Sequence, residues 1–271
     1  MLDLFGPTLH IGCSSVGLAL LRRDRFGRGI GVPQERGLLS APGSVDLLAS
    51  QLQEMLAALP CQGAITTVTV SDDWCRLFVV TPPANAAHRR DCEAALALRF
   101  QQLYGDAAND WVLQADWRMD RPFLAAALPR TLHTALLQIG ARFRLRTVAL
   151  LPHGIAAWNR WHDQLQRGDW FGVAHADWLT LFGIEGGALR AVRRVALRQE
   201  DMLDPTWPGQ CIEREALRLN LPLPQRVRLC GEVPQPWTLA ATGQLPCLAL
   251  QQKNLPALSL DAALAYAGVP A

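Results

Sequence analysis

Apolar and polar residues alternate over the first part of the chain with the period of two that a half-buried strand requires. Val16, Leu18 and Leu20 share one side of the segment VGLALL. A helical spacing of apolar residues follows, with Ser44 placed to cap the helix at its start and Pro60 to close it. The pattern predicts three strands, a helix and a fourth strand, in this order, at residues 9–13, 16–21, 28–33, 45–59 and 64–71.

The same order of elements recurs in the second half of the chain. The segments FGVAHA, DWLTLFGI and ALRAVRRVAL read as strands, with Gly186 and Gly187 in a tight turn between the second and third. A helix over 210–219 and the strand RVRLC follow. Since two such units occur, the sequence predicts a duplicated α/β protein with two related lobes.

The middle of the chain breaks this symmetry and predicts an inserted α+β subdomain. Pro82 and Pro83 end a strand, WCRLFVV, and further strands and helices come before the second repeat. Strands are predicted at 111–117, 122–128 and 146–151, and helices at 87–104, 130–141, 154–166 and 260–267. We expect residues 1–72 and 144–169 to form the first lobe, 73–143 the inserted subdomain and 170–271 the second lobe.

Composition narrows the class of protein. Of the 271 residues, 50% are hydrophobic and 18% charged, which excludes global disorder, and a net charge of +2 does not by itself imply a polyanionic partner. No apolar run is long enough to span a membrane, and the N-terminus lacks the features of a secretory signal, so we expect a soluble, cytoplasmic protein. The seven cysteines show no metal or redox spacing, which favours buried, reduced thiols.

The first predicted hairpin, HIGCSS, is where an actin-like ATPase would hold phosphate. Gly12, Ser14 and Ser15 supply backbone N–H groups and hydroxyls, but His10 stands where such a site needs an acid. The matching hairpin of the second repeat also lacks the Asp-x-Gly pattern; its residues are Gly172, Ala174, His175, Asp177 and Thr180. The hairpins are either degenerate phosphate sites or simple turns, and simple turns are favoured.

The sequence gives less support to other catalytic and binding sites. No G-x-S-x-G elbow and no GxxxxGK[ST] loop is present, and His10, Cys13 and His175 are too loosely spaced to indicate a metal site. Trp158 and Trp161 share a helix face, for which packing between the lobes is favoured over partner binding. Arginines decorate two strands without an interleaved aromatic platform, so nucleic-acid binding is not favoured; they are Arg142, Arg144, Arg146, Arg190, Arg193, Arg194 and Arg198.

Four segments together resemble PilM of type IV pili and the cytoplasmic domain of GspL of type II secretion. They are LHIGCSSVGLALLRR, VTVSDDWCRLFVV, HRRDCEAALALRFQQLYGD and GVAHADWLTLFGIEGGALRAVRR. The resemblance implies duplicated actin-like (ribonuclease H-like) lobes. His10 in place of the acid, and Gly231-Glu232 where a Gly-Gly pair would follow the RVRLC strand, make the chain similar to the GspL type, which has largely lost its nucleotide site. Unlike GspL, the chain is expected to have no membrane anchor.

The resemblance implies a non-catalytic adaptor without cofactor, cytoplasmic and peripheral to the inner membrane. It would dock a short cytoplasmic segment of an inner-membrane platform protein, with a secretion or pilus motor ATPase as a further partner and no nucleic acid. The alternatives are an ATP-binding protein with nucleotide-dependent lobe closure and, less favoured, an enzyme of sugar-kinase type. We expect the peptide beside Pro82-Pro83, with Arg76, Arg89 and Arg90 attracting acidic flanks; an ordinary solvated face remains an equal reading of these arginines.

Overall fold

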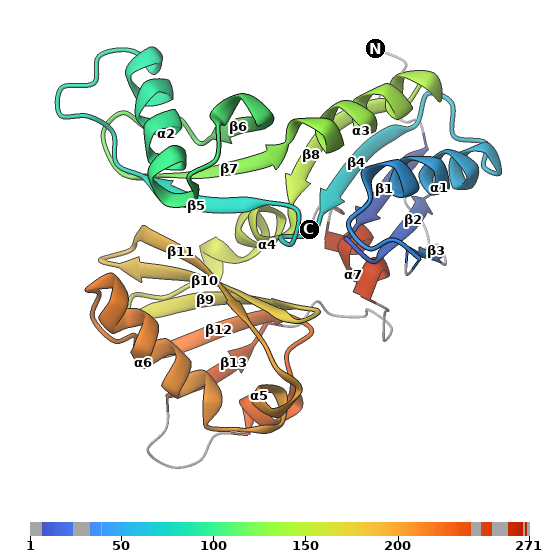
Figure 1. Cartoon of the computed structure of the whole chain (residues 1–271). Helices are drawn as coiled ribbons and strands as arrows, with labels where there is room; N and C mark the ends of the chain where they lie inside the picture. The colour runs from blue at the N-terminus through green and yellow to red at the C-terminus, as the bar shows by residue number, and fades with distance from the viewer. Residues whose placement is uncertain are drawn as a thin grey trace.

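The structure is a computed structural model that describes residues 7–23, 33–38, 40–239, 245–250, 260–267 and 269. Its elements form two lobes, each built on a five-stranded mixed sheet, and a smaller subdomain with a three-stranded sheet that projects from the first lobe above the second (Figure 1). The fold class predicted from the sequence, a duplicated α/β protein with an insertion, matches this arrangement.

The first sheet has the strand order β3-β2-β1-β4-β8. The first three strands in this order are antiparallel, whereas β1, β4 and β8 run parallel. Alternate residues of β2 face opposite sides: Leu18 and Leu20 pack toward α1 and α3, and Ala19 and Leu21 toward α7. The strands are β1 (Thr8–Cys13), β2 (Gly17–Arg23), β3 (Gln34–Gly37), β4 (Ile65–Val70) and β8 (Arg146–Pro152), and the helices are α1 (Val45–Ala57), α3 (Arg130–Arg142) and α7 (Leu260–Ala267).

The second sheet repeats this topology with the order β11-β10-β9-β12-β13. Its first three strands are antiparallel and its last three parallel, so each strand has a counterpart in the first sheet. The strands are β9 (Asp169–His175), β10 (Trp178–Glu185), β11 (Ala188–Ala196), β12 (Arg226–Gly231) and β13 (Cys247–Ala249). The remaining elements of the lobe are α5 (Gln199–Leu203), α6 (Trp207–Leu219) and the 3-10 helix η3 (Gln235–Thr238).

The inserted subdomain is a sheet of order β5-β7-β6 with α2 packed on it. Phe78, Phe100 and Phe123 form its core with small residues of β7. Its elements are β5 (Arg76–Val80), α2 (Arg89–Tyr104), the 3-10 helix η1 (Ala108–Asp110), β6 (Trp111–Ala115) and β7 (Phe123–Pro129). The helix α4 (His153–Trp161) and the 3-10 helix η2 (His162–Gln164) then lead from the first lobe into the second.

The structure places two helices in other lobes than expected, and one expected strand lies almost wholly outside the described residues. α3 was expected within the insertion at 73–143, but Leu132, Leu136 and Ile139 pack in the core of the first lobe. α7 was expected in the second lobe, but it covers β1 and β2 of the first, because its apolar residues Ala265 and Tyr266 complete that face of the sheet. The third strand was expected at 28–33, of which residues 28–32 lie outside the described part; β3 begins at Gln34.

All seven cysteines are buried and none forms a disulfide, as the sequence predicted. Trp158 stacks on Phe182 of β10 at 5.3 Å and lies edge-on to Phe171 of β9 at 6.1 Å. Trp161 packs against the same cluster. The two tryptophans of α4 therefore hold this helix against the second lobe, as their spacing predicted.

Candidate functional site

The loop between β1 and β2 is tied to two carboxylates of the chain itself. The Ser14 hydroxyl donates a hydrogen bond to Oδ1 of Asp261 at 2.7 Å, and the backbone N–H of Ser15 donates to Oδ2 of Asp73 at 3.0 Å. Burial raises the pKa of the Asp261 carboxyl; the bond from Ser14 opposes this, and the charges of Glu35 and Asp73 add to it. The groups that a phosphate hairpin would offer to a ligand are thus held by an acidic cluster.

Gly12 and Gly17 allow α7 to approach this hairpin closely. A Cβ atom on Gly12 would lie 2.6 Å from the backbone nitrogen of Ala265, and one on Gly17 would collide with the Asp261 carboxylate. Both glycines have backbone conformations open to other residues, so it is close helix packing that requires them here. From the sequence, Gly12 was predicted to be part of either a degenerate phosphate hairpin or, preferably, a simple turn; in the structure it is also a packing position for α7.

Asp72 joins the two lobes in the turn that follows β4. Its Oδ1 accepts a hydrogen bond from the N–H of Gly154 at the start of α4, and its Oδ2 accepts one from the Thr180 hydroxyl of β10, each at 2.9 Å. Arg194 of β11 donates to its backbone carbonyl. Burial raises the pKa of the Asp72 carboxyl, and these hydrogen bonds partly offset that effect. Because one oxygen is bonded to the start of α4 and the other to β10 of the second lobe, Asp72 links the lobes.

Two buried histidines meet beside Asp72. The rings of His153, at the start of α4, and His175, at the end of β9, contact edge to face with centroids 5.1 Å apart. Burial lowers the pKa of His153 to about 4, and burial together with the neighbouring His153 lowers the pKa of His175 to about 3. Both rings are therefore neutral near pH 7. As neutral imidazoles, the two side chains bring no charge to the cleft beside Asp72.

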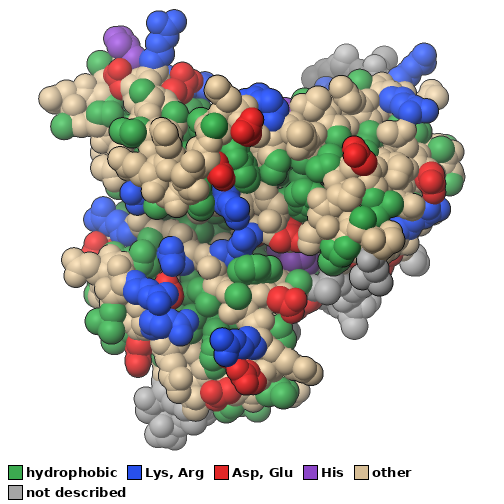
Figure 2. All heavy atoms as spheres, in the orientation of Figure 1, with side chains coloured by type: hydrophobic (Ala, Val, Ile, Leu, Met, Phe, Trp, Pro, Cys, Tyr) green, Lys and Arg blue, Asp and Glu red, His purple; other side chains and the backbone are tan. Residues whose placement is uncertain are grey.

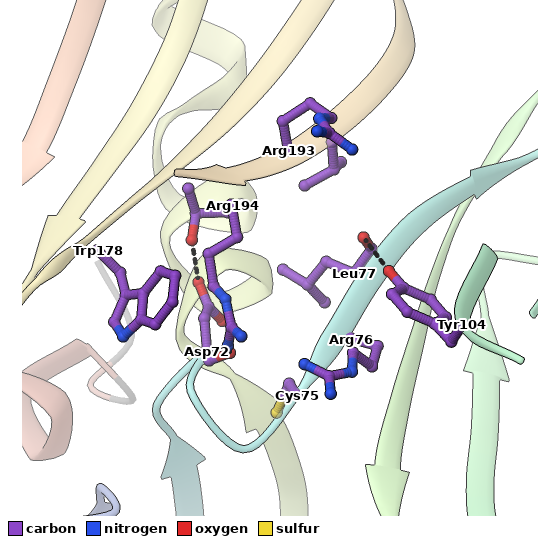
Figure 3. Close-up of a pocket in the computed structure, with 10 residues that line it drawn as sticks. Asp72, Cys75, Arg76, Leu77, Tyr104, Trp178, Arg193 and Arg194 are labelled. Carbon is purple, nitrogen blue, oxygen red and sulfur yellow. Dashed lines mark hydrogen bonds between the residues drawn. The ribbon is translucent and has the colours of Figure 1, made fainter. Parts of the chain in front are cut away.

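Arginines from both sides line the cleft next to Asp72 (Figure 3). Arg194 stacks over Trp178 with 4.2 Å between the guanidinium carbon and the ring centroid, and Arg76 lies over Tyr104 at 5.4 Å. Together with Arg193 they border a cavity of about 210 Å³. The sequence showed the arginines of β11 but not their opposition to Arg76, because that contact joins two segments far apart in the chain.

The structure separates the three arginines expected to bind a partner. Arg76 begins β5 and contacts Tyr104 at the end of α2, whereas Arg89 and Arg90 begin α2. A helix of 16 residues places its two ends about 24 Å apart at 1.5 Å per residue. Arg89 is paired with Glu93 at 2.8 Å and stacked over Trp117 at 4.4 Å, while Arg90 is exposed. These residues do not form one surface.

The remaining sequence motifs fall into ordinary structural roles. The second hairpin forms between β9 and β10 as predicted. The Thr180 hydroxyl donates its hydrogen bond to Asp72, and a Cβ atom on Gly172 would lie 2.7 Å from the Leu229 side chain. Cys13 packs in the first core and His175 against His153, so the loose metal set of His10, Cys13 and His175 is not assembled. Within the described residues, no group of three or more metal-ligating side chains is arranged to hold an ion.

A nucleotide, which the resemblance raises as an alternative, does not fit the first hairpin in this arrangement. Its phosphates would displace Asp73 from the Ser15 N–H and Asp261 from the Ser14 hydroxyl, and would lie against two carboxylates of like charge. Asp72, Asp73 and Asp261 were not singled out from the sequence. For Asp72 and Asp73 a signal was present, since they directly follow a buried parallel strand, the edge at which α/β sheets place functional groups.

Three solved structures share this fold over nearly the whole chain. A Bacteroides thetaiotaomicron protein with an actin-like ATPase fold and unknown function matches with a TM-score of 0.61 and 13% identity, over 98% of this chain and 99% of that one. The PilM–PilN type IV pilus biogenesis complex matches with a TM-score of 0.60 and 15% identity, over 96% and 97%. The cytoplasmic domain of EpsL, an inner-membrane component of the Vibrio cholerae type II secretion system, matches with a TM-score of 0.54 and 12% identity, over 96% and 93%.

These similarities show that the chain has an actin-like fold, as its resemblance to PilM and GspL predicted. No protein-family model matches the sequence, and no curated protein matches it. None of the helices that the structure describes is both long and apolar enough to cross a membrane.

Proposed function

We propose that this protein is a non-catalytic, actin-like adaptor of a type IV pilus or type II secretion assembly platform. It docks a short cytoplasmic segment of an inner-membrane partner and is peripheral to the membrane through that partner. The observation that carries the proposal is the occupation of the first hairpin by Asp261 and Asp73, the position where an actin-like ATPase would hold phosphate. A protein that keeps the lobes and fills this position with its own carboxylates uses the fold for binding.

The structural similarity to the PilM–PilN complex and to the EpsL cytoplasmic domain supports the proposal of a type IV pilus or type II secretion platform. The first is described as a type IV pilus biogenesis complex and the second as part of an inner-membrane component of type II secretion, and both align over nearly all of this chain.

An ATP-binding protein with nucleotide-dependent lobe closure is the second function to consider. It is favoured by the presence of corresponding hairpins in the two lobes and by the hydrogen bond from Thr180 to Asp72, which joins the lobes. For this function, the Ser14–Asp261 bond would have to open whenever nucleotide enters.

The surface proposed for the membrane partner is the exposed start of α2. The loop of residues 81–88 carries Pro82 and Pro83 and is largely exposed, and Arg90 adds a positive charge without a salt-bridge partner among the described residues. Acidic residues flanking an apolar peptide would be attracted to this end of the inserted subdomain.

A pull-down tests this docking directly. Cytoplasmic segments of inner-membrane platform proteins are immobilised, and the wild type is compared with Arg89→Glu/Arg90→Glu and with the control Arg142→Glu/Arg146→Glu, which reverses two exposed charges of the first lobe. We expect capture of the wild type and the control, and loss of capture for the first variant at low salt. If no segment is captured by the wild type, the adaptor function is wrong; if capture survives the Arg89/Arg90 reversal, the surface is wrong.

A further inference from the structure

Two adjoining cavities run along β11 where it faces β5 and α2. The first, about 210 Å³, and the second, about 310 Å³, share the lining residues Tyr104, Val192 and Arg193. They form one groove between the inserted subdomain and the second lobe, and Figure 2 shows blue side chains on both sides of this hollow. The groove is separate from the hairpin that holds Ser14 and from the start of α2.

The groove is strongly basic. Its arginines are Arg76, Arg99, Arg190, Arg193 and Arg194, and its one acidic lining residue is Asp72, whose carboxylate oxygens are already hydrogen-bonded to the protein. Arg190 and Arg193 each have a carboxylate at 3.3 Å, from Glu185 and Glu215. In the part of the chain that the structure describes, the other three arginines have no salt-bridge partner.

The arginines without a salt-bridge partner include two that are fixed by stacking on aromatic rings. Arg76 lies over Tyr104 and Trp111, and its buried Nε has no hydrogen-bond partner among the described residues. Arg194 is stacked on Trp178, and burial and the nearby charge of Arg76 both lower its pKa. Stacking fixes a guanidinium plane while leaving N–H groups on its edge free for an anion. An acidic group between these two side chains would relieve their repulsion and accept hydrogen bonds from the guanidinium edges that face the groove.

The spacing of the charges favours an extended ligand. Arg190 and Arg194 are four positions apart on β11, a separation of about 13 Å at 3.3 Å per residue, so a single phosphate cannot contact both. β11 and β5 are edge strands of their sheets and present unpaired backbone groups. Apolar side chains lie between the arginines, among them Leu77, Val79 and Leu221. Alternating acidic and apolar side chains on an extended backbone match this lining.

We propose that this groove binds an extended acidic segment of a partner protein, which lies along β11 with its carboxylates on Arg76, Arg99 and Arg194. The arginines select for acidic residues, and the apolar lining accommodates the side chains between them. This site does not depend on the proposed adaptor function, since it rests on the arginines and the strand edges alone.

Fluorescence anisotropy with a labelled peptide of alternating glutamate and valine tests the proposal. Arg76→Gln/Arg99→Gln removes two charges from the groove without touching Arg194, which also binds the Asp72 carbonyl. Arg142→Gln/Arg146→Gln removes two exposed charges elsewhere. We expect the groove variant to bind about tenfold or more weakly, because each arginine–carboxylate contact is charge-assisted, and the control to bind within about twofold of the wild type. Thermal melting verifies that both variants are folded.

Hydrogen exchange with the same peptide locates the contact, with slower exchange expected in β11 and β5. The proposal is overturned if the wild type does not bind the peptide at low salt or if both variants lose affinity equally. It is also overturned if the peptide slows exchange in other elements and not in β11 and β5. Inorganic phosphate that displaces the peptide at equal concentration would indicate a small-anion site instead. Oligothymidylate that binds more tightly than the peptide, through the same arginines, would indicate a single-stranded nucleic acid. Capture of a membrane segment in the pull-down is unaffected by any of these outcomes.

Discussion

The hydroxyl of Ser14 donates a hydrogen bond at 2.7 Å to the carboxylate of Asp261, a residue 247 positions later in the chain. This bond fastens the C-terminal helix α7 to the hairpin between β1 and β2, beside Gly12 and Gly17, whose missing side chains make room for the helix. The position of α7 and the state of the hairpin are therefore coupled: a ligand that needs the Ser14 hydroxyl has to compete with Asp261 for it.

Replacing Asp261 with alanine should destabilise the protein, because the buried Ser14 hydroxyl then loses its acceptor at 2.7 Å and keeps only the longer contact, 3.3 Å, to the carbonyl of Gly17. We expect the free energy of unfolding to fall by about 1.5–3 kcal/mol, the usual range for a hydrogen bond to a charged group. Asp46→Ala is the matched control, since Asp46 also lies in the first turn of a helix but is exposed. Urea denaturation measures both, and equal losses in the two variants would mean that the Ser14 bond contributes nothing specific.

Gly12→Ala should be destabilising although it adds only a methyl group. The new Cβ would lie 2.6 Å from backbone atoms of α7, which cannot yield as a flexible side chain would, so we expect a loss of about 1–3 kcal/mol. Gly209→Ala in α6 provides the contrast: its nearest neighbour would be 3.9 Å away, and alanine favours a helix over glycine by up to about 1 kcal/mol. Thermal melting measures both variants, and equal melting temperatures for Gly12→Ala and Gly209→Ala would contradict the close packing described for α7.

The buried pair His153 and His175 predicts loss of stability on acidification. Their folded-state pKa values, about 4 and about 3, lie below the usual 6.5, so the unfolded chain takes up protons that the folded protein does not. Stability should therefore fall as pH drops below about 6.5, by up to about 1.4 kcal/mol per pH unit for each histidine. The free energy of unfolding, measured at several pH values across this range, should depend less steeply on pH for His175→Gln than for the wild type. His88→Gln, at an exposed position, controls for the substitution itself.

The duplicated lobes were predictable from the sequence because their signals are local. Alternation in VGLALL and DWLTLFGI, and the helical spacing after Ser44, report which side of each segment is buried, and the order of segments then gives the repeat. The placement of α3 and α7 was not predictable in this way. An amphipathic helix shows that it packs on something, but its pattern does not say which sheet it covers.

The site was predictable only where neighbours in sequence are also neighbours in space. The hairpin of Ser14 and Ser15 was located correctly, but its partners Asp73 and Asp261 come from other segments. Grouping Arg76 with Arg89 and Arg90 followed from their closeness in sequence, and α2 then carries them to opposite ends of the subdomain. Arg76 instead faces Arg194, a pairing that depends on how the insertion sits over the second lobe.

Calorimetric titration with magnesium-ATP tests the central claim. In this actin-like fold, the hairpin that would bind nucleotide is hydrogen-bonded to carboxylates of the chain itself. We predict no heat of binding for the wild type, none for Ser14→Ala, and no steady hydrolysis in a turnover assay, because Asp261 and Asp73 hold the hairpin's donors and neutral histidines border the cleft. Stoichiometric binding by the wild type that Ser14→Ala abolishes would contradict the claim and establish the nucleotide-dependent alternative.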